Sequence, residues 1–256
     1  AVAIIVAGKK QWGFALMLSL SVVIPTYNEK ENISVLIDRL LSNLSSIKGA
    51  YEIIVVDDNS PDFTSGVVEQ YARIHHDIRL IRRVDKRDLS AALALGFDSA
   101  KGEYLLAMDA DLQHSPGLAI DMLEAAQHSN ADLVVATRYA MGGSTSNWGA
   151  LRGFLSRFST RLAAYVVGTT ISDPLSGFFI LRRDVWVACR PRMHLAGFKI
   201  LLEIISANPG ISSHEIGYQF VARERGKSKL GFAASWAFIL ALLRLFWKVR
   251  MGEKGL

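Results

Sequence analysis

Short apolar segments alternate with amphipathic segments from residue 18 to residue 137, and this alternation limits the fold more than any other feature. The apolar segments have the length and β-branched content of buried strands, and the others repeat apolar residues at helical spacing. The predicted strands are Leu18–Pro25, Tyr51–Val56, Ile78–Arg82, Glu103–Met108 and Ala131–Thr137, and the predicted helices are Glu29–Leu44, Asp62–Ile74, Leu89–Ala100 and Pro116–His128. This order predicts an α/β fold, a mostly parallel sheet with helices on both faces.

The second half of the chain is less regular. We predict helices over Leu151–Val167 and Gly197–Ala207, a turn and an apolar strand within Ile171–Leu181, and a last strand over Glu215–Val221. A basic loop, Arg223–Lys229, follows. The pattern indicates one catalytic domain at residues 18–230, and residues 1–17 are predicted to be an N-terminal extension.

A long apolar run lies within residues 231–256. Phe232–Trp247 is interrupted only by Ser235 and Arg244, and as a helix it reaches about 24 Å, short of a ~30 Å hydrocarbon core. It could dock on the domain core, lie in a membrane interface or belong to a membrane anchor. Because apolar residues occupy nearly every face, we predict a membrane-associated helix. The single cysteine, Cys189, favours a reducing compartment and hence the cytoplasmic face of a membrane.

The formal net charge of +5 conceals an uneven distribution. Residues 1–128 carry 12 basic and 17 acidic side chains, whereas residues 129–256 carry 17 and 7. The first half therefore suits cations, and the second suits anions such as phosphate or a membrane surface, with solvated helix faces as the alternative. No aromatic residue lies between Arg223 and Lys229, which argues against a nucleic-acid partner.

Three predicted strands end in polar segments, where the ligands of parallel α/β sheets bind. These segments are PTYNE after the first strand, DDNSPD after the second and DADLQ after the fourth. The sequence has no G-x-G-x-x-G after the first strand and no G-x-x-x-x-G-K, which argues against a dinucleotide fingerprint and a P-loop. We therefore expect a nucleotide held by carboxylates and a metal.

Asp109, Asp111 and Gln113 are the candidate metal ligands. Alternate residues of an extended segment point to the same side, so two carboxylates and an amide oxygen would face one ion. Such hard oxygen ligands suit Mg²⁺ or Mn²⁺. A surface turn is the alternative, but the strand that precedes the motif favours the metal. His114 adjoins the motif and is a secondary candidate for ligand contact.

Further candidates follow the other strands. Asp58 could accept hydrogen bonds from a nucleobase or ribose and Tyr27 could stack near the base, with helix capping and packing on the sheet edge as alternatives. Arg138 closes the fifth strand, and Arg152 and Ser156 are four residues apart on one predicted helix face. Arginine forks and serine hydroxyls suit phosphate oxygens; a solvated surface charge is the alternative for each arginine.

Eight segments carry a family resemblance. They are SVVIPTYNEKENI, EIIVVDDNSPD, YLLAMDADLQH, ATRYAMGGS, WGALRGFLS, SDPLSGFFILRR, GFKILLEI and RERGKSKL. In their order and spacing, from about Leu18 to Leu230, they resemble the polyprenol-phosphate (dolichol-phosphate) mannosyltransferases, inverting family-2 glycosyltransferases. The resemblance implies a GT-A fold, a Rossmann-like and mostly parallel sheet, for residues 18–230.

The resemblance also implies roles for individual positions. Asp111, Arg138 and Arg152 are the implied catalytic residues. The implied sets are Pro25, Tyr27, Glu29, Asp58 and Asp109 for the nucleotide; Asp109, Asp111 and Gln113 for the metal; Arg138, Arg152 and Ser156 for the acceptor phosphate; Arg223 and Lys229 for the diphosphate; and Asp173, Ser176 and Gly177 for the sugar pocket. Asp88 stands where the family commonly has glycine, so close contact between the backbone there and the nucleotide is not expected.

The activity that the resemblance implies is transfer of mannose from GDP-mannose to a polyprenyl or dolichyl monophosphate, with inversion and with Mn²⁺ or Mg²⁺. A glucosyltransferase or another transferase that uses a UDP-sugar would share nearly every residue. A non-catalytic nucleotide-sugar-binding membrane module is the alternative of another class, although Asp109 and Asp111 are intact. A processive polysaccharide synthase would carry a Q-x-x-R-W segment, which this chain lacks.

Overall fold

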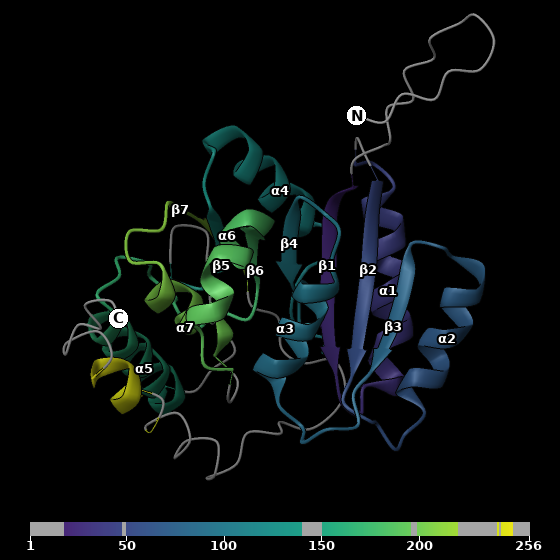
Figure 1. Ribbon diagram of the computed structural model, residues 1–256, viewed down its shortest axis with the longest axis horizontal. Helices are drawn as coiled ribbons and strands as arrows, with labels where there is room; N and C mark the ends of the chain where they lie inside the picture. The colour runs from purple at the N-terminus through teal and green to yellow at the C-terminus, as the bar shows by residue number, and fades with distance from the viewer. Residues whose placement is uncertain are drawn as a thin grey trace, which may run out of the picture.

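The predicted strands and helices of the first half all form, in the predicted order (Figure 1). The computed structural model describes residues 18–47, 50–139, 150–195, 199–219, 240 and 242–247. Its strands are β1 (Leu18–Thr26), β2 (Ala50–Asp57), β3 (Ile78–Arg82), β4 (Tyr104–Ala107), β5 (Leu133–Thr137), β6 (Phe179–Arg182) and β7 (Ser213–Gly217). Its helices are α1 (Lys30–Leu44), α2 (Thr64–Ile74), α3 (Leu89–Ser99), α4 (Leu118–Ser129), α5 (Ala150–Val167), α6 (Arg183–Cys189) and α7 (Ile200–Ala207), with a 3-10 turn at Arg190–Arg192.

The strands form one sheet in the order β3-β2-β1-β4-β6-β5-β7. All neighbouring pairs are parallel except those of β6, which runs antiparallel to both β4 and β5. Because β6 is reversed, Phe179 at its start pairs with Ala107 and Val135 near the carboxyl ends of its neighbours. The loop that leads into β6 therefore arrives at the edge where β4 and β5 end. The predicted parallel sheet is confirmed; the reversed strand and helix α6 were not predicted.

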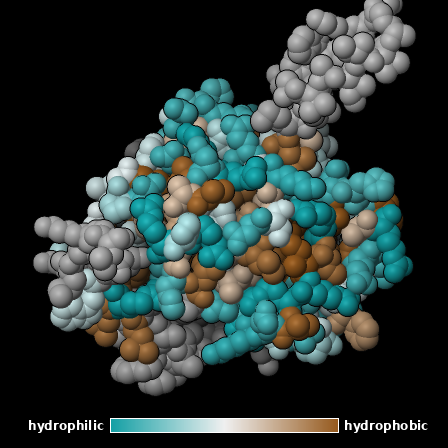
Figure 2. Space-filling model, in the orientation of Figure 1, coloured by the Kyte–Doolittle hydropathy of each residue, from teal (hydrophilic) through white to brown (hydrophobic). Residues whose placement is uncertain are grey.

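Two hydrophobic cores flank the sheet, because alternate side chains of each strand point to opposite faces. In β1, for example, Val22 packs into one core and Val23 into the other. Helices α1, α2 and α4 cover the first face; α3, α5, α6 and α7 cover the second. Outside these cores, most of the described surface is hydrophilic in the view of Figure 2, with hydrophobic side chains gathered toward the middle of that face.

A glycine allows α3 to lie directly on the sheet. A Cβ atom at Gly96 would come within 2.2 Å of Val23 Cγ1 and 3.1 Å of Val56 Cγ2. Only a residue without a side chain permits this separation between helix and sheet. The contact sets the position of α3, whose first turn lies beside the carboxyl ends of β2 and β3.

Part of the predicted C-terminal helix contacts the domain. Residues 242–247 are helical, and Leu242 and Leu245 are buried in the second core. Leu240, Leu243 and Trp247 are each more than half exposed. Within the described part of the chain, no helix combines the length and the apolar character needed to cross a membrane. The predicted extension at residues 1–17, the basic loop Arg223–Lys229 and residues 231–239 lie outside the described residues.

Candidate active site

The loops after β1 and β2 are joined by hydrogen bonds from one to the other. The carboxylate of Asp57 accepts hydrogen bonds from the hydroxyl of Thr26 and from the backbone N–H and hydroxyl of Ser60. The carboxylate of Asp62 accepts from the backbone N–H of Lys30 and from both donors of Thr64. These carboxylates therefore take part in folding the loops.

Asp58 is the carboxylate between them, and its surroundings differ. It is 7% exposed, its Oδ1 lies 2.8 Å from Arg83 Nη1, and its Oδ2 accepts the backbone N–H of Asp88 at 3.0 Å. Burial raises the pKa of Asp58, against the opposing effects of the Asp88 N–H and the Arg83 guanidinium. The predicted nucleotide-pocket residue is thus held between the loops that follow β2 and β3.

The other residues predicted to bind the nucleotide lie on neighbouring loops. Pro25 is buried in β1, paired in register with Val56. Tyr27 is half-buried, and the Arg87 guanidinium lies over its ring at 4.4 Å from the centroid. Glu29 accepts a hydrogen bond from the Asn32 amide at 2.7 Å. Tyr27, Glu29 and Asp58 therefore belong to one group of loops at the carboxyl ends of β1 and β2.

Asp88 stands where the family that this sequence resembles commonly has glycine, but its backbone does not adopt the positive φ that would require one. Its φ is −157°, an extended value that any residue adopts. Its carboxylate accepts the backbone N–H of Ala91 at 3.0 Å and so caps the N-terminus of α3. Asp88 therefore supports Asp58 through its backbone and α3 through its side chain.

The predicted metal motif forms a tight loop after β4. Asp111 is buried, and its Oδ1 accepts the backbone N–H of Gln113 at 3.2 Å. Leu112, between them, has a φ of +61°, which is unusual for a residue with a Cβ atom. Asp109 is half-buried, and its backbone N–H donates to His114 Nδ1 at 3.2 Å. The prediction that the motif is extended throughout is therefore wrong, because the chain turns at Leu112.

His114 is buried against this loop. Its ring stacks on Phe178, with centroids 4.7 Å apart and planes 13° apart. Burial lowers the pKa of His114 to about 4, with a further lowering by Arg138 and an opposing effect from Asp111. The imidazole is therefore neutral at pH 7, which its acceptor role at Nδ1 requires.

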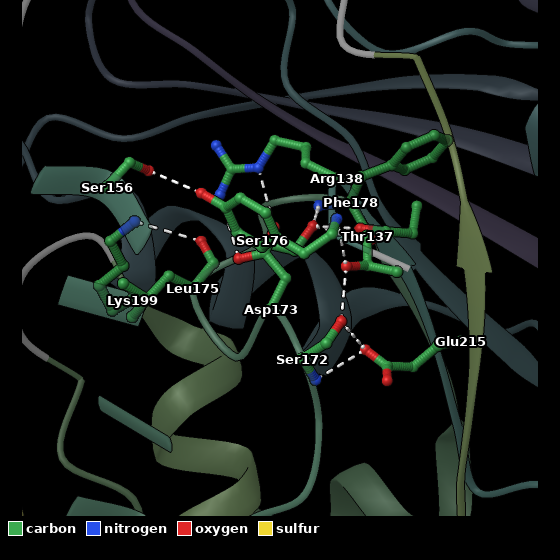
Figure 3. Close-up of polar contacts among 12 residues, drawn as sticks. Thr137, Arg138, Ser156, Ser172, Asp173, Leu175, Ser176, Phe178, Lys199 and Glu215 are labelled. Carbon is green, nitrogen blue, oxygen red and sulfur yellow. Dashed lines mark hydrogen bonds and ion pairs between the residues drawn. The ribbon is translucent and has the colours of Figure 1, made fainter. Parts of the chain in front are cut away.

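A buried ion pair lies on the other side of the site. Arg138 Nε and Nη2 donate to Asp173 Oδ2 and Oδ1 at 2.8 and 3.0 Å, and the Asp173 side chain has no exposed surface (Figure 3). Arg138 follows β5, and Asp173 belongs to the loop that leads into the reversed strand β6. The residue predicted to bind the acceptor phosphate and one predicted for the sugar pocket therefore form a bidentate pair.

Hydroxyl groups hold the loops around this pair (Figure 3). The Ser176 hydroxyl donates to the carbonyl of Ala136 at 2.8 Å, which joins the loop before β6 to β5. The backbone N–H and hydroxyl of Ser172 donate to Glu215 Oε1 on β7. The Ser156 hydroxyl lies 2.8 Å from the hydroxyl of Tyr139. Ser156 thus faces, from α5, the residue that follows Arg138 after β5.

Gly177 brings the two sides together. A Cβ atom at this position would lie 3.0 Å from Asp109 Oδ2, so a larger residue would push against the carboxylate of the metal motif. Gly177 precedes Phe178, the residue on which His114 stacks. Asp109 and the Arg138–Asp173 pair consequently belong to one region, around the loop before β6.

Lys199 and Tyr218 also face this site and were not predicted. Lys199, at the start of α7, is half-buried and donates to the carbonyl of Leu175 at 3.2 Å. Burial lowers the pKa of Lys199 to about 8; the Arg138 charge adds to this effect, and Asp173 and Asp109 oppose it. Burial also raises the pKa of Tyr218. Lys199 lies within the quoted segment GFKILLEI, but neither residue belongs to a polar run after a predicted strand.

Two predicted groups are therefore placed at one edge of the sheet: the nucleotide loops after β1 and β2, and the Asp109–Asp173 region after β4 and β5. Arg152 belongs to α5, but its side chain lies outside the described part of the structure, as do Arg223 and Lys229. Among the described residues, no three His, Cys, Asp or Glu side chains form a group able to hold a metal ion.

Comparison with known proteins agrees with this architecture. The profile of glycosyl transferase family 2 matches residues 21–187. Solved structures with a similar fold include glucosyl-3-phosphoglycerate synthase from Mycobacterium tuberculosis in complex with Mn²⁺, UDP and glucosyl-3-phosphoglycerate (TM-score 0.66, 16% identity, covering 91% of this chain and 80% of that one). Mannosyl-3-phosphoglycerate synthase from Rubrobacter xylanophilus is also similar (TM-score 0.67, 19% identity, covering 93% and 78%). These likenesses confirm the GT-A fold.

Two relatives by sequence are dolichol-phosphate mannosyltransferases. The Pyrococcus furiosus protein is 35% identical over 230 residues, covering 89% of this chain, and the chain spans 64% of that protein's length. The Saccharomyces cerevisiae protein is 36% identical over 239 residues, which cover 90% of this chain and 88% of that protein. The order of motifs, the carboxylate loops at the ends of β1, β2 and β4, and these identities agree. The chain belongs to glycosyl transferase family 2 and, within it, to the dolichol-phosphate mannosyltransferases.

Proposed function

We propose that this protein transfers mannose from GDP-mannose to dolichyl phosphate, or to a polyprenyl phosphate of the same chemistry, with inversion at the anomeric carbon. The observation that carries the proposal is that one loop, before β6, supplies both Asp173, which pairs with Arg138, and Gly177, which lies beside the Asp109 carboxylate. It gives one site both the carboxylates that suit a metal-bound diphosphate and a guanidinium that suits a second phosphate. The relatives' names supply the choice of mannose and dolichyl phosphate.

A divalent metal is part of this proposal, and the residues present fit it. Asp109 and Asp111 offer carboxylate oxygens and Gln113 an amide oxygen, and Gly177 leaves room beside Asp109. With two protein carboxylates, the remaining ligands would be diphosphate oxygens and water, which is how Mg²⁺ is commonly held. When bound, the metal would stabilise the negative charge of the leaving nucleoside diphosphate. Mn²⁺ accompanies UDP in one structure of the Mycobacterium tuberculosis synthase.

The remaining roles follow the position of each residue at the edge. Tyr27 and Asp58 would bind the nucleoside, Arg138 the acceptor phosphate, and Asp173 the sugar pocket together with its hold on Arg138. The full proposed sets are Pro25, Tyr27, Glu29, Asp58 and Asp109 for the nucleotide; Arg138, Arg152 and Ser156 for the acceptor phosphate; Arg223 and Lys229 for the diphosphate; and Asp173, Ser176 and Gly177 for the sugar pocket. The hydroxyl of Ser176 would act by holding the loop, because its hydrogen bonds run to the backbone.

In the proposed reaction, an acceptor phosphate oxygen attacks the anomeric carbon of mannose from the side opposite the diphosphate. A carbon–oxygen bond to the lipid phosphate forms while the bond to the nucleoside diphosphate breaks, which inverts the configuration. The acceptor phosphate is already anionic near neutral pH, so no side chain has to remove a proton. The protein's contribution is to hold two anionic reactants in line, with Arg138 and Lys199 offsetting their charge.

A donor and acceptor panel tests the proposal. Purified protein is incubated with radiolabelled GDP-mannose, UDP-glucose or UDP-galactose, with dolichyl phosphate or dolichol, and with Mn²⁺, Mg²⁺ or EDTA; lipid is then extracted and counted. We expect lipid-linked label only with GDP-mannose, dolichyl phosphate and metal. Labelling from a UDP-sugar would contradict the proposed donor and indicate a glucosyl- or galactosyltransferase instead. Nucleotide binding without any sugar transfer would support the non-catalytic alternative.

We also propose that the protein contacts the cytoplasmic face of a membrane, where its acceptor would lie. Phe158, Leu162 and Tyr165 are exposed on one face of α5, at i, i+4 and i+7, and support this proposal. A flotation assay with anionic liposomes tests it: we expect co-flotation that weakens when Phe158 and Tyr165 are both changed to Ser, with circular dichroism unchanged. Equal flotation of the variant and the original protein would contradict the proposed contact face.

A further inference from the structure

We propose that His114 is a positioning residue: by accepting the backbone N–H of Asp109 at Nδ1, it fixes the direction in which the Asp109 carboxylate points. This inference rests on the proposed function, because it assigns Asp109 to metal and diphosphate binding. His114 itself would touch neither substrate nor metal. Its effect would be exerted through the peptide that precedes the Asp109 side chain.

The imidazole is held from three parts of the sheet edge. It comes from the loop after β4, stacks on Phe178 of the loop before β6, and meets Tyr218, which follows β7, edge-to-face at 6.0 Å. Phe178 and Tyr218 also contact one another edge-to-face at 6.0 Å. With 4% of its surface exposed, the His114 ring has little freedom to rotate. A hydrogen bond from this ring therefore anchors Asp109 to a rigid aromatic group.

The hydrogen bond from the Asp109 N–H defines which nitrogen of the His114 ring carries the proton. Nδ1 lies 3.2 Å from the Asp109 nitrogen, which is a donor only, so Nδ1 must carry a lone pair. The ring proton consequently resides on Nε2. A side chain without an acceptor at this position would leave the Asp109 N–H without its imidazole partner in a buried setting, which costs free energy and favours a shift of the peptide.

The loop needs such an anchor because its turn is strained. Leu112 adopts a φ of +61° while 95% buried, and Asp111 and Gln113 on either side are joined by the hydrogen bond from Gln113 N–H to Asp111 Oδ1. Non-glycine residues keep this backbone conformation only where their surroundings impose it. The bond between Asp109 and His114 closes the loop around Leu112, and burial of the Leu112 side chain holds its centre.

Two substitutions separate the hydrogen bond from the packing of the ring. The His114→Phe variant keeps a ring that can stack on Phe178 but has no acceptor. The His114→Asn variant loses the stack but places an amide oxygen close to the position of Nδ1. His128→Phe, an exposed histidine on α4, is the matched control.

The first measurement is Mn²⁺ binding in the presence of GDP, followed by electron paramagnetic resonance. We expect the His114→Phe variant to bind Mn²⁺ at least tenfold more weakly, and the His114→Asn and His128→Phe variants to stay within about threefold of the original protein. Binding by His114→Phe at full affinity would overturn the proposal. So would equal weakening by Phe and Asn, because the stack rather than the hydrogen bond would then matter.

The second measurement needs neither metal nor activity. Hydrogen–deuterium exchange of the Asp109 amide in the metal-free protein should be at least tenfold faster in His114→Phe and near the original rate in His114→Asn. Unchanged exchange in His114→Phe would overturn the proposal by itself. If the original protein bound no Mn²⁺, the metal in the proposed function would fail, whereas the exchange rates would still decide the role of His114.

Discussion

Two acidic loops, one after β2 and one after β4, look alike in sequence but are used differently in the structure. Each follows a buried strand at the same edge of the sheet. After β2, the oxygens of Asp57 and Asp62 accept hydrogen bonds from donors of their own segment and of the segment that follows β1, so their charge serves the fold. After β4, the Asp109 carboxylate lies beside Gly177, where a Cβ atom would come within 3.0 Å of its Oδ2.

The comparison teaches that similar acidic runs after strands can serve the fold in one loop and a proposed ligand site in another, depending on which donors surround each carboxylate. Asp57 is surrounded by hydroxyl and backbone N–H groups, which satisfy it without a ligand. The loop after β4 is instead braced through its backbone, by His114 at Asp109 and by the burial of Leu112. Four substitutions test this distinction, in order of decreasing expected effect.

The largest effect is expected for Asp111→Asn in the loop after β4. Loss of a carboxylate that would hold the metal should lower transfer of mannose to lipid phosphate at least 1,000-fold, about 4 kcal/mol of transition-state stabilisation. The free energy of unfolding should change by less than about 1 kcal/mol. Lipid extraction assays and urea titrations measure the two effects, with exposed Asp121→Asn as the control. Turnover above one tenth of the original would contradict the role of Asp111.

The next effect is expected at the buried ion pair. Asp173→Ala would leave the Arg138 guanidinium, 14% exposed, without its bidentate partner and should reduce the free energy of unfolding by about 3 kcal/mol. The matched control is Glu69→Ala, which breaks the more exposed pair with Arg82 and should cost less than about 1 kcal/mol. Urea denaturation compares them. Equal losses would show that burial does not distinguish the two pairs.

Asp57→Asn tests the other acidic loop. Replacing one oxygen by an amide donor opposes the hydrogen bonds from Ser60 and Thr26, and we expect a loss of about 2 kcal/mol in the free energy of unfolding. The affinity for Mn²⁺ should stay within about threefold of the original, since Asp57 is not a proposed ligand. If this variant kept its stability but lost metal binding, the assignment of the two loops would have to be exchanged.

The smallest effect is a pH dependence caused by Lys199. Its pKa is about 8 in the folded protein and 10.5 in the reference state, so the unfolded chain holds the proton more tightly between these values. Stability from this group therefore rises with pH, by about 1 to 2 kcal/mol between pH 7.5 and 9.5. Urea titrations of the original protein and Lys199→Met at both pH values measure it. A difference between the two proteins that stays constant with pH would contradict burial of a titrating ammonium group at this site.

The fold was largely predictable because its signals are local. Apolar β-branched runs and helical spacing identify Ile78–Arg82 to the residue and place most other elements within a few positions. The direction of a four-residue apolar strand leaves no such signal, so the reversal of β6 was not predicted. That reversal is what delivers Asp173 and Gly177 to the edge where β4 and β5 end.

The residues of the candidate site likewise divide into those that local sequence signals identify and those that only packing brings together. Asp58, Asp109 and Asp111 could be found from the sequence because each follows a strand directly, and the carboxyl ends of parallel strands share one edge. Lys199 and Tyr218 could not, since their approach depends on how α7 and β7 pack against the sheet. The partner of His114 was also hidden, because its ring acts on a backbone N–H rather than on another side chain.

The sequence by itself determined an α/β sheet, the strand ends that carry chemistry, the uneven distribution of charge and the resemblance to a family of lipid-phosphate mannosyltransferases. Only the tertiary structure decided which carboxylates accept hydrogen bonds within the loops, which arginine forms a buried ion pair, and which loops lie close together. The physical reason is the distance along the sequence between the residues that interact. Strand and helix patterns are fixed by neighbouring residues, whereas the pairing of Arg138 with Asp173, 35 residues apart, depends on the packing of the whole sheet edge.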